Sequence, residues 1–373
     1  MSWEKMRKAL SRCTECGECE QYCSIFLTMG DHSAHQKLQI IGELMEGREL
    51  TDEEINSVFM CTKCEACQEV CPQEIPTIEI FDWARHAIQS KYGFRNKKQQ
   101  ILVQNILHYG NPFGETTSRL LDVPAPAERI VHKEEVIPPS STLLHLGCML
   151  AYRFADMRDD LLEIFNLLEI DYTLLEEEKC CGYFIWNTGD HHSAEKVIQE
   201  NARIFDQYDR IICACAGCYT FFKQNYPHPE KFYHNIEIIN EKLKELNIAS
   251  LKEKGEHDCV IFHDSCHLTR PHGIIEPPRE VLRQIGYELE EFPLSGKEGL
   301  CCGADGGMRI VNPELALTMG NARLNQLKEH QDLPFLTLCP FCIFNFRECV
   351  SEEEPWKIGS LYQYIRQYLE KAL

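Results

Sequence analysis

Eight cysteines near the start of the chain fall into two runs with the same spacing. Both runs read C-x2-C-x2-C-x3-C; the first holds Cys13, Cys16, Cys19 and Cys23, and the second holds Cys61, Cys64, Cys67 and Cys71. This repeated spacing is typical of ferredoxins that bind two cubane [4Fe-4S] clusters, in which the fourth cysteine of each run ligates the other cluster. The spacing predicts one cluster on Cys13, Cys16, Cys19 and Cys71, and a second on Cys61, Cys64, Cys67 and Cys23. A pair of zinc sites is the alternative, but zinc needs only four ligands and gains nothing from the third C-x2 step.

Ten further cysteines form two sets, each containing a vicinal Cys-Cys-Gly. The first set is Cys148, Cys180, Cys181, Cys215 and Cys218, and the second is Cys266, Cys301, Cys302, Cys339 and Cys342. Five thiolates are too many for one cubane cluster or one tetrahedral zinc ion. Gly182 and Gly303 follow the vicinal pairs, and glycine tolerates the left-handed backbone of a sharp turn. One extended, multi-iron centre for each set is the best explanation; structural zinc in one set, shaping a docking surface, is the alternative.

The composition excludes other uses for the 21 cysteines. The first residues, MSWEKMRKALSRC, are charged and lack the apolar stretch of a secretory signal. No apolar run approaches the roughly 20 residues that cross a bilayer. We therefore expect a cytoplasmic protein that reaches membranes only through a partner. Because a reducing cytosol does not maintain ten disulfides, the cysteines are expected to be metal ligands or redox catalysts. The net charge of −20 argues against nucleic acid and anionic membranes as partners.

Residues 1–95 are expected to form a helical module that carries both ferredoxin-type runs. Residues 35–47 have a helical apolar pattern, and Thr51 with Glu54 forms a capping-box signature. A further helix is expected to end at Gly93. Residues 96–140 are rich in proline and charge and lack a clear period, so we assign them to a connector.

From residue 141 onward, strand and helix patterns recur in the same order. Matched cysteines of the two sets differ by 118 to 124 positions. The alternation predicts two duplicated α/β domains with parallel sheets, residues 141–250 and 251–373, with ligands at the carboxyl ends of strands. The first strand of each domain is expected to end at Cys148 or Cys266. Ser193 and Asn312 are the expected caps of the helices that follow the vicinal pairs.

This order of motifs resembles the heterodisulfide reductase family over nearly the whole chain, in particular its fused catalytic D subunits. The phrases FHDSCHLTR, EPPREVL, CCGADGG and CPFC strengthen the resemblance. It implies a helical two-cluster ferredoxin module followed by two CCG domains, each binding a noncubane [4Fe-4S] cluster through its five cysteines. It also implies that the two noncubane clusters face one another. The methanogenic disulfide of coenzyme M and coenzyme B would be split between them, with electrons arriving through the cubane clusters.

The main alternative function is electron transfer. Relatives with this architecture serve beside flavin-dependent dehydrogenases for glycolate, lactate or glycerol-3-phosphate, and often lack ligands in one CCG motif. This chain has all ten, which favours an enzyme, the catalytic subunit of a heterodisulfide reductase-like complex. No glycine-rich dinucleotide fingerprint precedes a helix, so flavin or nicotinamide is expected on a partner. A flavoprotein, a hydrogenase or formate dehydrogenase module, or a cytochrome b-type membrane subunit would donate the electrons.

Few residues outside the cysteine sets are candidates for the site. His267 directly follows Cys266 and is a candidate proton donor to a departing thiolate; the alternative is a strand-end histidine that hydrogen-bonds only backbone. Lys179, Arg270 and Arg309 could hold anionic groups of a substrate. Asp305 departs from the glycine of relatives and weakens the match to an anionic substrate. We expect Cys213, Cys259 and Cys349, which lie outside the motifs, to be ordinary buried thiols.

Overall fold

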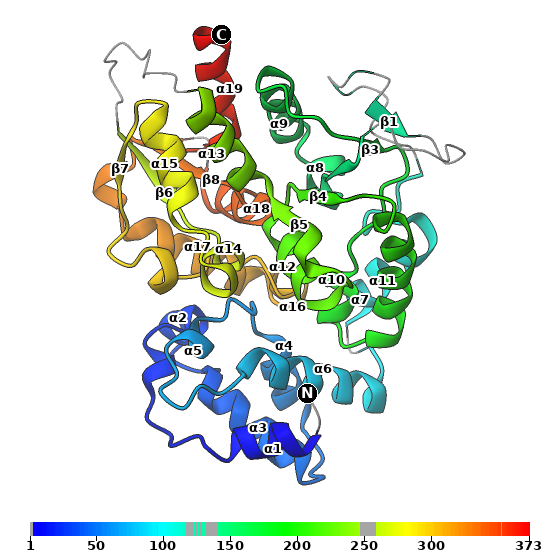
Figure 1. Ribbon diagram of the computed structural model, residues 1–373. Coiled ribbons are helices and arrows are strands. Elements are labelled where there is room, and N and C mark those ends of the chain that lie inside the picture. Colours follow the sequence, from blue (N-terminus) through cyan, green and yellow to red (C-terminus); the bar gives the residue numbers. More distant parts are fainter. Residues whose placement is uncertain are drawn as a thin grey trace.

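The computed structural model describes residues 3–94, 96–116, 123, 126, 129–131, 140–246, 259–351 and 353–373. Figure 1 shows a helical module and, above it, two α/β domains that stand side by side. Both sheets are parallel throughout. The predicted fold class, a helical module followed by duplicated parallel α/β domains, is confirmed.

The helical module consists of α1 (Trp3–Leu10), α2 (Ser24–Met29), α3 (Ala34–Met45), α4 (Asp52–Phe59), α5 (Ala66–Glu69) and α6 (Thr77–Tyr92). The predicted capping box is present, since Thr51 and Glu54 each accept a hydrogen bond from the other's backbone. Gly93 ends α6 as expected. The apolar faces of these helices, except α2, meet in one small core around Ile41, Val58 and Phe81. Ile25 of α2 packs instead against residues of α16 (Met308–Val311) and α17 (Pro313–Asn325).

The segment assigned to a connector begins with a helix that the sequence pattern did not predict, α7 (Lys97–Tyr109). Asn96 caps it by accepting hydrogen bonds from the backbone of Lys98 and Gln99. Val103 and Ile106 pack into the core of the α/β domains. Ile101 and Leu107 are about half exposed on the other faces, and they obscure the apolar period that would have revealed the helix. Much of residues 117–139 lies outside the described residues.

The first α/β domain contains α8 (Gly147–Tyr152), α9 (Ala155–Leu167), α10 (Tyr183–Asn187), α11 (His191–Phe205), α12 (Ala216–Asn225) and α13 (Asn235–Leu246). Its strands are β2 (Thr142–His145), β3 (Leu174–Leu175), β4 (Arg210–Cys213) and β5 (Phe232–His234), and β3 also pairs with β1 (Ile130–Val131). The sheet runs in the order β2-β4-β5, and β3 approaches β2 through a bridge between Leu143 and Thr173.

The second domain contains α14 (Cys266–His272), α15 (Glu276–Gln284), α16 (Met308–Val311), α17 (Pro313–Asn325), α18 (Pro340–Cys349) and α19 (Leu361–Ala372). Its strands β6 (Cys259–His263), β7 (Glu288–Glu290), β8 (Pro334–Thr337) and β9 (Lys357–Ser360) form a sheet in the order β7-β6-β8-β9. Each strand has a counterpart in the first domain, so the duplication seen in the sequence is also a duplication of topology.

The last helix of each domain packs on the other domain. Helix α13 lies against α15, where Asn240 and Lys244 both reach Glu280. Helix α19 lies against α9, joined by an ion pair of 2.5 Å between Arg366 Nε and Asp160 Oδ1. Apolar residues of both domains consequently form one continuous core. The boundary that the sequence places between residues 250 and 251 lies outside the described residues.

Three local predictions in the α/β domains were wrong, and one was right. The first strands end at His145 and His263 rather than at the cysteines, so Cys148 and Cys266 lie on the following helices. Helix α11 is capped by Asp190, whose carboxylate accepts from the backbone of Ser193. Aspartate and serine are both good N-caps. Because the helix starts at Asp190 instead of Ser193, His191 lies in its first turn, where the ring stacks on Trp186. Asn312 caps α17 with Pro313 at its first position, as predicted.

Candidate active site and cluster-binding cysteines

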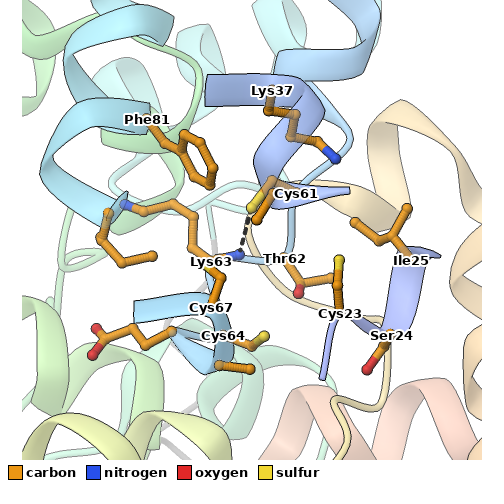
Figure 2. Close-up of a pocket in the computed structure, with 14 residues that line it drawn as sticks. Cys23, Ser24, Ile25, Lys37, Cys61, Thr62, Lys63, Cys64, Cys67 and Phe81 are labelled. Carbon is orange, nitrogen blue, oxygen red and sulfur yellow. Dashed lines mark hydrogen bonds between the residues drawn. The ribbon is translucent and has the colours of Figure 1, made fainter. Parts of the chain in front are cut away.

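Four cysteines surround a small pocket in the helical module. Figure 2 shows Cys61, Cys64 and Cys67 of the second run together with Cys23, which reaches across from the first run. Lys37 also lines this pocket and is 1 % exposed. Burial lowers the pKa of Lys37, although the nearby Cys61 and Cys23 thiolates oppose that shift. The spacing of the runs predicted this grouping, and the identity of the bound group stays a prediction.

The other four cysteines of the module surround a second pocket, which is lined by Cys13, Cys16, Cys19 and Cys71. Cys67 lines both pockets, so the two groups are neighbours. Cys16 is the exposed member, which places this group nearer to solvent. All 21 cysteines lie in the described residues and none forms a disulfide. Two groups of four free thiols, each around its own pocket, fit a pair of thiolate-ligated clusters.

The first CCG set converges on a larger cavity. Its thiols form a chain of interacting neighbours in the order Cys148, Cys180, Cys181, Cys218 and Cys215. Gly182, with φ of 91°, provides the turn after the vicinal pair. All five cysteines line a cavity of about 250 Å³. Convergence of five thiols, four of them buried, on one space fits a single multi-iron group better than separate zinc ions.

Both domains and the connector helix build the walls of this cavity. Leu102 of α7 and the rings of Phe113, Phe184, Phe341 and Phe344 make it strongly apolar. The loop after the second vicinal pair, residues 304–310, closes the cavity from the second domain. The first set of thiols therefore faces a space that can hold a small molecule.

The second CCG set is enclosed. Its thiols form a matching chain in the order Cys266, Cys301, Cys302, Cys342 and Cys339. None of these five lines the cavity of about 250 Å³. The ring of His263 at the end of β6 lies within 4.8 Å of the Cys302 and Cys342 thiols. Gly303 makes the turn with φ of 95°.

The helical module contacts the second set directly. The Cys64 thiol, from the group of Cys23, Cys61, Cys64 and Cys67, lies close enough to the Cys301 thiol for each to shift the pKa of the other. Ser24 Oγ accepts a hydrogen bond of 3.0 Å from the backbone N–H of Cys301. The Arg270 guanidinium donates to the carbonyl oxygens of Cys64 at 2.7 Å and of Gly299. The second cysteine run and the second CCG set therefore meet at Cys64 and Cys301.

Arg85 hydrogen-bonds to all three parts of the molecule, and the sequence patterns did not identify it. It is completely buried, and its guanidinium donates to the carbonyl oxygens of Cys61 at 2.8 Å, Gly306 at 2.9 Å and Asn187 at 3.2 Å. These carbonyls belong to the module, the second domain and the first domain. An arginine among the apolar residues on the buried face of α6 is the signal that could have revealed it.

His267 lies in the first turn of α14 with its side chain bonded to other side chains. Its Nε2 is 2.8 Å from Asp305 Oδ2 and 3.4 Å from Tyr183 Oη. The expectation of a backbone-only partner is therefore wrong. Burial disfavours the charged ring, but the Asp305 carboxylate raises the pKa of His267 above its usual value. Asp305 and Tyr183 line the cavity, whereas His267 stands behind them.

The three candidate anion-binding residues have different surroundings. Lys179 forms a surface ion pair of 2.8 Å with Glu200 and does not line the cavity. The Arg270 guanidinium donates its hydrogen bonds to backbone carbonyl oxygens. Arg309 does line the cavity, with Arg153, which the sequence pattern did not single out.

Of the three cysteines outside the motifs, Cys213 is buried on β4, while Cys259 and Cys349 are half-buried. The Cys349 thiol donates to the carbonyl oxygen of Leu317. None of the three lines a cysteine pocket.

In the described part of the chain, every helix is too short or too polar to span a membrane. Comparison with protein families gives two kinds of match. A cysteine-rich (CCG) domain matches residues 142–223 and again residues 260–347. A 4Fe-4S dicluster domain matches residues 9–75. These matches coincide with the two α/β domains and the helical module.

Curated relatives extend over most of the chain. The D subunit of dihydromethanophenazine:CoB–CoM heterodisulfide reductase from Methanosarcina acetivorans is 28% identical over 371 residues, covering 91% of this chain and 88% of that protein. The B subunit of fumarate reductase (CoM/CoB) from Methanothermobacter marburgensis is 27% identical, covering 93% of this chain and 69% of that protein. EtfAB:quinone oxidoreductase of Syntrophomonas wolfei is 26% identical, covering 98% of this chain and 58% of that protein. The chain therefore joins a 4Fe-4S dicluster domain to two CCG domains, and over most of its length it is similar to iron–sulfur oxidoreductases.

Proposed function

We propose that this chain reduces a small disulfide, of the coenzyme M–coenzyme B type, between its two CCG domains. The cavity of about 250 Å³ carries the proposal, because five thiols of one domain and the loop after the vicinal pair of the other line it together. Noncubane clusters on the two sets would supply one electron each, which is what a two-electron cleavage to two thiols requires. The two cubane groups, one of them in contact with Cys301, would deliver those electrons.

The cavity residues have defined parts in this proposal. The phenylalanine rings exclude water from the disulfide, and Arg309 and Arg153 hold an anionic group of the substrate. The two thiols that leave need two protons. His267 is the proposed donor of one, which passes to the cavity through Tyr183 or Asp305, and water supplies the other.

Electron transfer within a flavin-dependent dehydrogenase complex is the second candidate function. The enclosure of the second set supports it, as do the two cavity cations, which already have acidic partners: Arg153 pairs with Glu115 at 2.6 Å, and Arg309 Nη2 lies 3.7 Å from Glu348. A strongly anionic disulfide finds few free cations there. Structural zinc in the second set is a third candidate, because His263, Cys302 and Cys342 are zinc-type ligands.

An anaerobic assay on iron-replete protein tests these candidates. Reduced viologen is the donor, and the coenzyme M–coenzyme B disulfide is the acceptor. Rapid dye oxidation that requires the disulfide supports the reductase. No turnover, with roughly sixteen irons bound as four clusters, supports the electron-transfer role with a partner flavoprotein. About twelve irons with one zinc supports structural zinc in one set.

A further inference from the structure

A histidine ends the first strand of each CCG domain, three residues before the first cysteine of that domain's set. These residues are His145 at the end of β2 and His263 at the end of β6. Both side chains are almost fully buried, with 1 % and 2 % of the residue exposed. The duplication therefore places the same side chain at the same position in both domains, and the surroundings of the two rings can be compared directly.

The His263 ring lies beside two thiols of the second set. One of its ring nitrogens and the sulfur atoms of Cys302 and Cys342 all lie within 4.8 Å of one another. Metal bonds of about 2.0 Å to nitrogen and about 2.3 Å to sulfur bring ligand atoms to similar separations. These three atoms are therefore within reach of a single metal ion.

The protein leaves one nitrogen of this ring without a partner. His263 Nδ1 is buried and has no hydrogen-bond partner among the described residues. Three phenylalanines surround the ring: Phe346 meets it edge-on with centroids 4.9 Å apart, Phe335 lies nearly parallel at 6.2 Å, and Phe292 lies edge-on at 6.2 Å. A buried polar atom left unpaired among apolar rings is destabilising. The unpaired nitrogen therefore indicates a partner that the polypeptide itself does not supply.

The equivalent histidine of the first domain has a different neighbour. His145 Nδ1 lies 3.4 Å from Oε2 of Glu178, which stands two residues before the vicinal pair. The matching position of the second domain is Gly299, which has no side chain, so no carboxylate from this position competes for His263. Within the described part of the chain, His145 forms no three-atom group of this kind with the first set of thiols. The arrangement around His263 is thus particular to the second domain.

We propose that His263 is a metal ligand of the second set, with one ring nitrogen bound to the metal that Cys302 and Cys342 also hold. Imidazole is a common ligand of iron, and in Rieske centres histidine replaces cysteine on one iron of the cluster. This inference rests on the proposed function only for the identity of the metal, which would be an iron of the second noncubane centre. The two centres would then differ in their ligands as well as in their access.

The nitrogen is detected by pulsed electron paramagnetic resonance on the cluster-loaded full chain, prepared with histidine carrying the heavy nitrogen isotope and reduced anaerobically. We expect a strong nitrogen coupling in the unaltered protein. It should be kept in Cys181→Ala, which removes the first centre, and lost in Cys302→Ala, which removes the second. A coupling no stronger than that of a hydrogen-bonded nitrogen would overturn the proposal, and so would a coupling that survives in Cys302→Ala.

His263→Phe assigns the nitrogen, because phenylalanine keeps the aromatic packing with Phe335 and Phe346 and has no ligand atom. The coupling should be lost, and iron should pass from the second centre to a chelator at least about tenfold faster. His145→Phe, the matched change at the end of β2, should keep both the coupling and the slow release of iron. Equal behaviour of the two variants would refute the role of His263.

His267→Asn keeps the test decisive if His263→Phe does not load the second centre. His267 directly follows Cys266, so its ring is the alternative source of a nitrogen signal. A coupling kept in His267→Asn upholds His263, whereas a coupling lost there refutes it.

Two further results separate this inference from the proposed function. The expected coupling without disulfide reduction would uphold His263 and reject the proposed reductase. If the second set holds zinc, X-ray absorption at the zinc edge replaces the resonance measurement. A nitrogen ligand of zinc that is lost in His263→Phe would uphold the ligand role and reject reduction at two iron centres, while zinc bound by sulfur alone would refute the ligand role.

Discussion

The two CCG domains have the same topology and the same thiol chain, yet their surroundings differ. The first set opens on a cavity, while the second is covered by the helical module and receives the Cys64 thiol. The duplicated cysteine sets therefore occupy different positions: one lines the cavity of about 250 Å³, and the other lies against the helical module. Equal chemistry in a pair of sites does not imply equal access.

The largest expected effect comes from deleting one vicinal cysteine in each set. Cys181→Ala and Cys302→Ala should each remove about four irons and lower disulfide reduction by at least about 100-fold, since even the loss of outer-shell partners costs 10–100-fold. Iron content, electron paramagnetic resonance and turnover measure this. Cys259→Ser, outside the motifs, is the control. Activity that survives Cys302→Ala would show that the enclosed set is not needed.

The contact with the module can be broken at Cys64. Cys64→Ser should slow electron delivery at least about tenfold, because it perturbs both the second cubane group and the contact with Cys301. Stopped-flow dye oxidation measures the delivery, and direct chemical reduction should show the CCG centres intact. Cys16→Ser, in the group nearer to solvent, provides the comparison. If Cys16→Ser has the larger effect with a small dye donor, electrons enter through the outer group.

The glycines that follow the two vicinal pairs allow the two CCG domains to be compared by the free energy of unfolding. A methyl group on Gly303 would lie 2.7 Å from the Ala316 carbonyl oxygen, whereas one on Gly182 would lie 3.4 Å from Val197. Both glycines are left-handed, so alanine costs about 1–2 kcal/mol at either. The overlap at Gly303 adds about 1–3 kcal/mol.

Denaturant unfolding of Gly303→Ala and Gly182→Ala under anaerobic conditions measures this difference. Gly47→Ala, left-handed but with open space around the new methyl, reports backbone strain alone. Equal destabilisation in all three variants would mean that the second domain adjusts around Gly303.

The smallest effect is expected at the rim of the cavity. Arg309→Gln should raise KM for an anionic disulfide up to about fivefold with little change in kcat, because a part-screened charge contact contributes about 1 kcal/mol or less. Lys179→Gln, a surface change outside the cavity, should leave KM unaltered. Steady-state kinetics with reduced viologen measure both variants. A larger change in Lys179→Gln would place the substrate elsewhere.

The sequence by itself determined the cysteine groups, the crossing of Cys23 and Cys71 between the two runs, the helical module and the duplicated parallel domains. These features can be predicted because they depend on short cysteine spacings and on local apolar periods, which involve residues close together in the chain. The same locality explains the misplaced strand ends and the missed helix α7, where packing against distant residues outweighs a weak local pattern.

Only the tertiary structure decided which CCG set faces a cavity and which meets the module. It also decided that α13 and α19 pack on the opposite domains, and that His267 pairs with Asp305. Arg85 and Arg270 owe their positions to carbonyl groups more than 100 residues away. Such contacts form only when whole elements pack together, so the spacing of residues along the chain does not predict them. The duplicated sequences place the two cysteine sets at equivalent positions in their domains, and only the packing of the helical module makes their surroundings different.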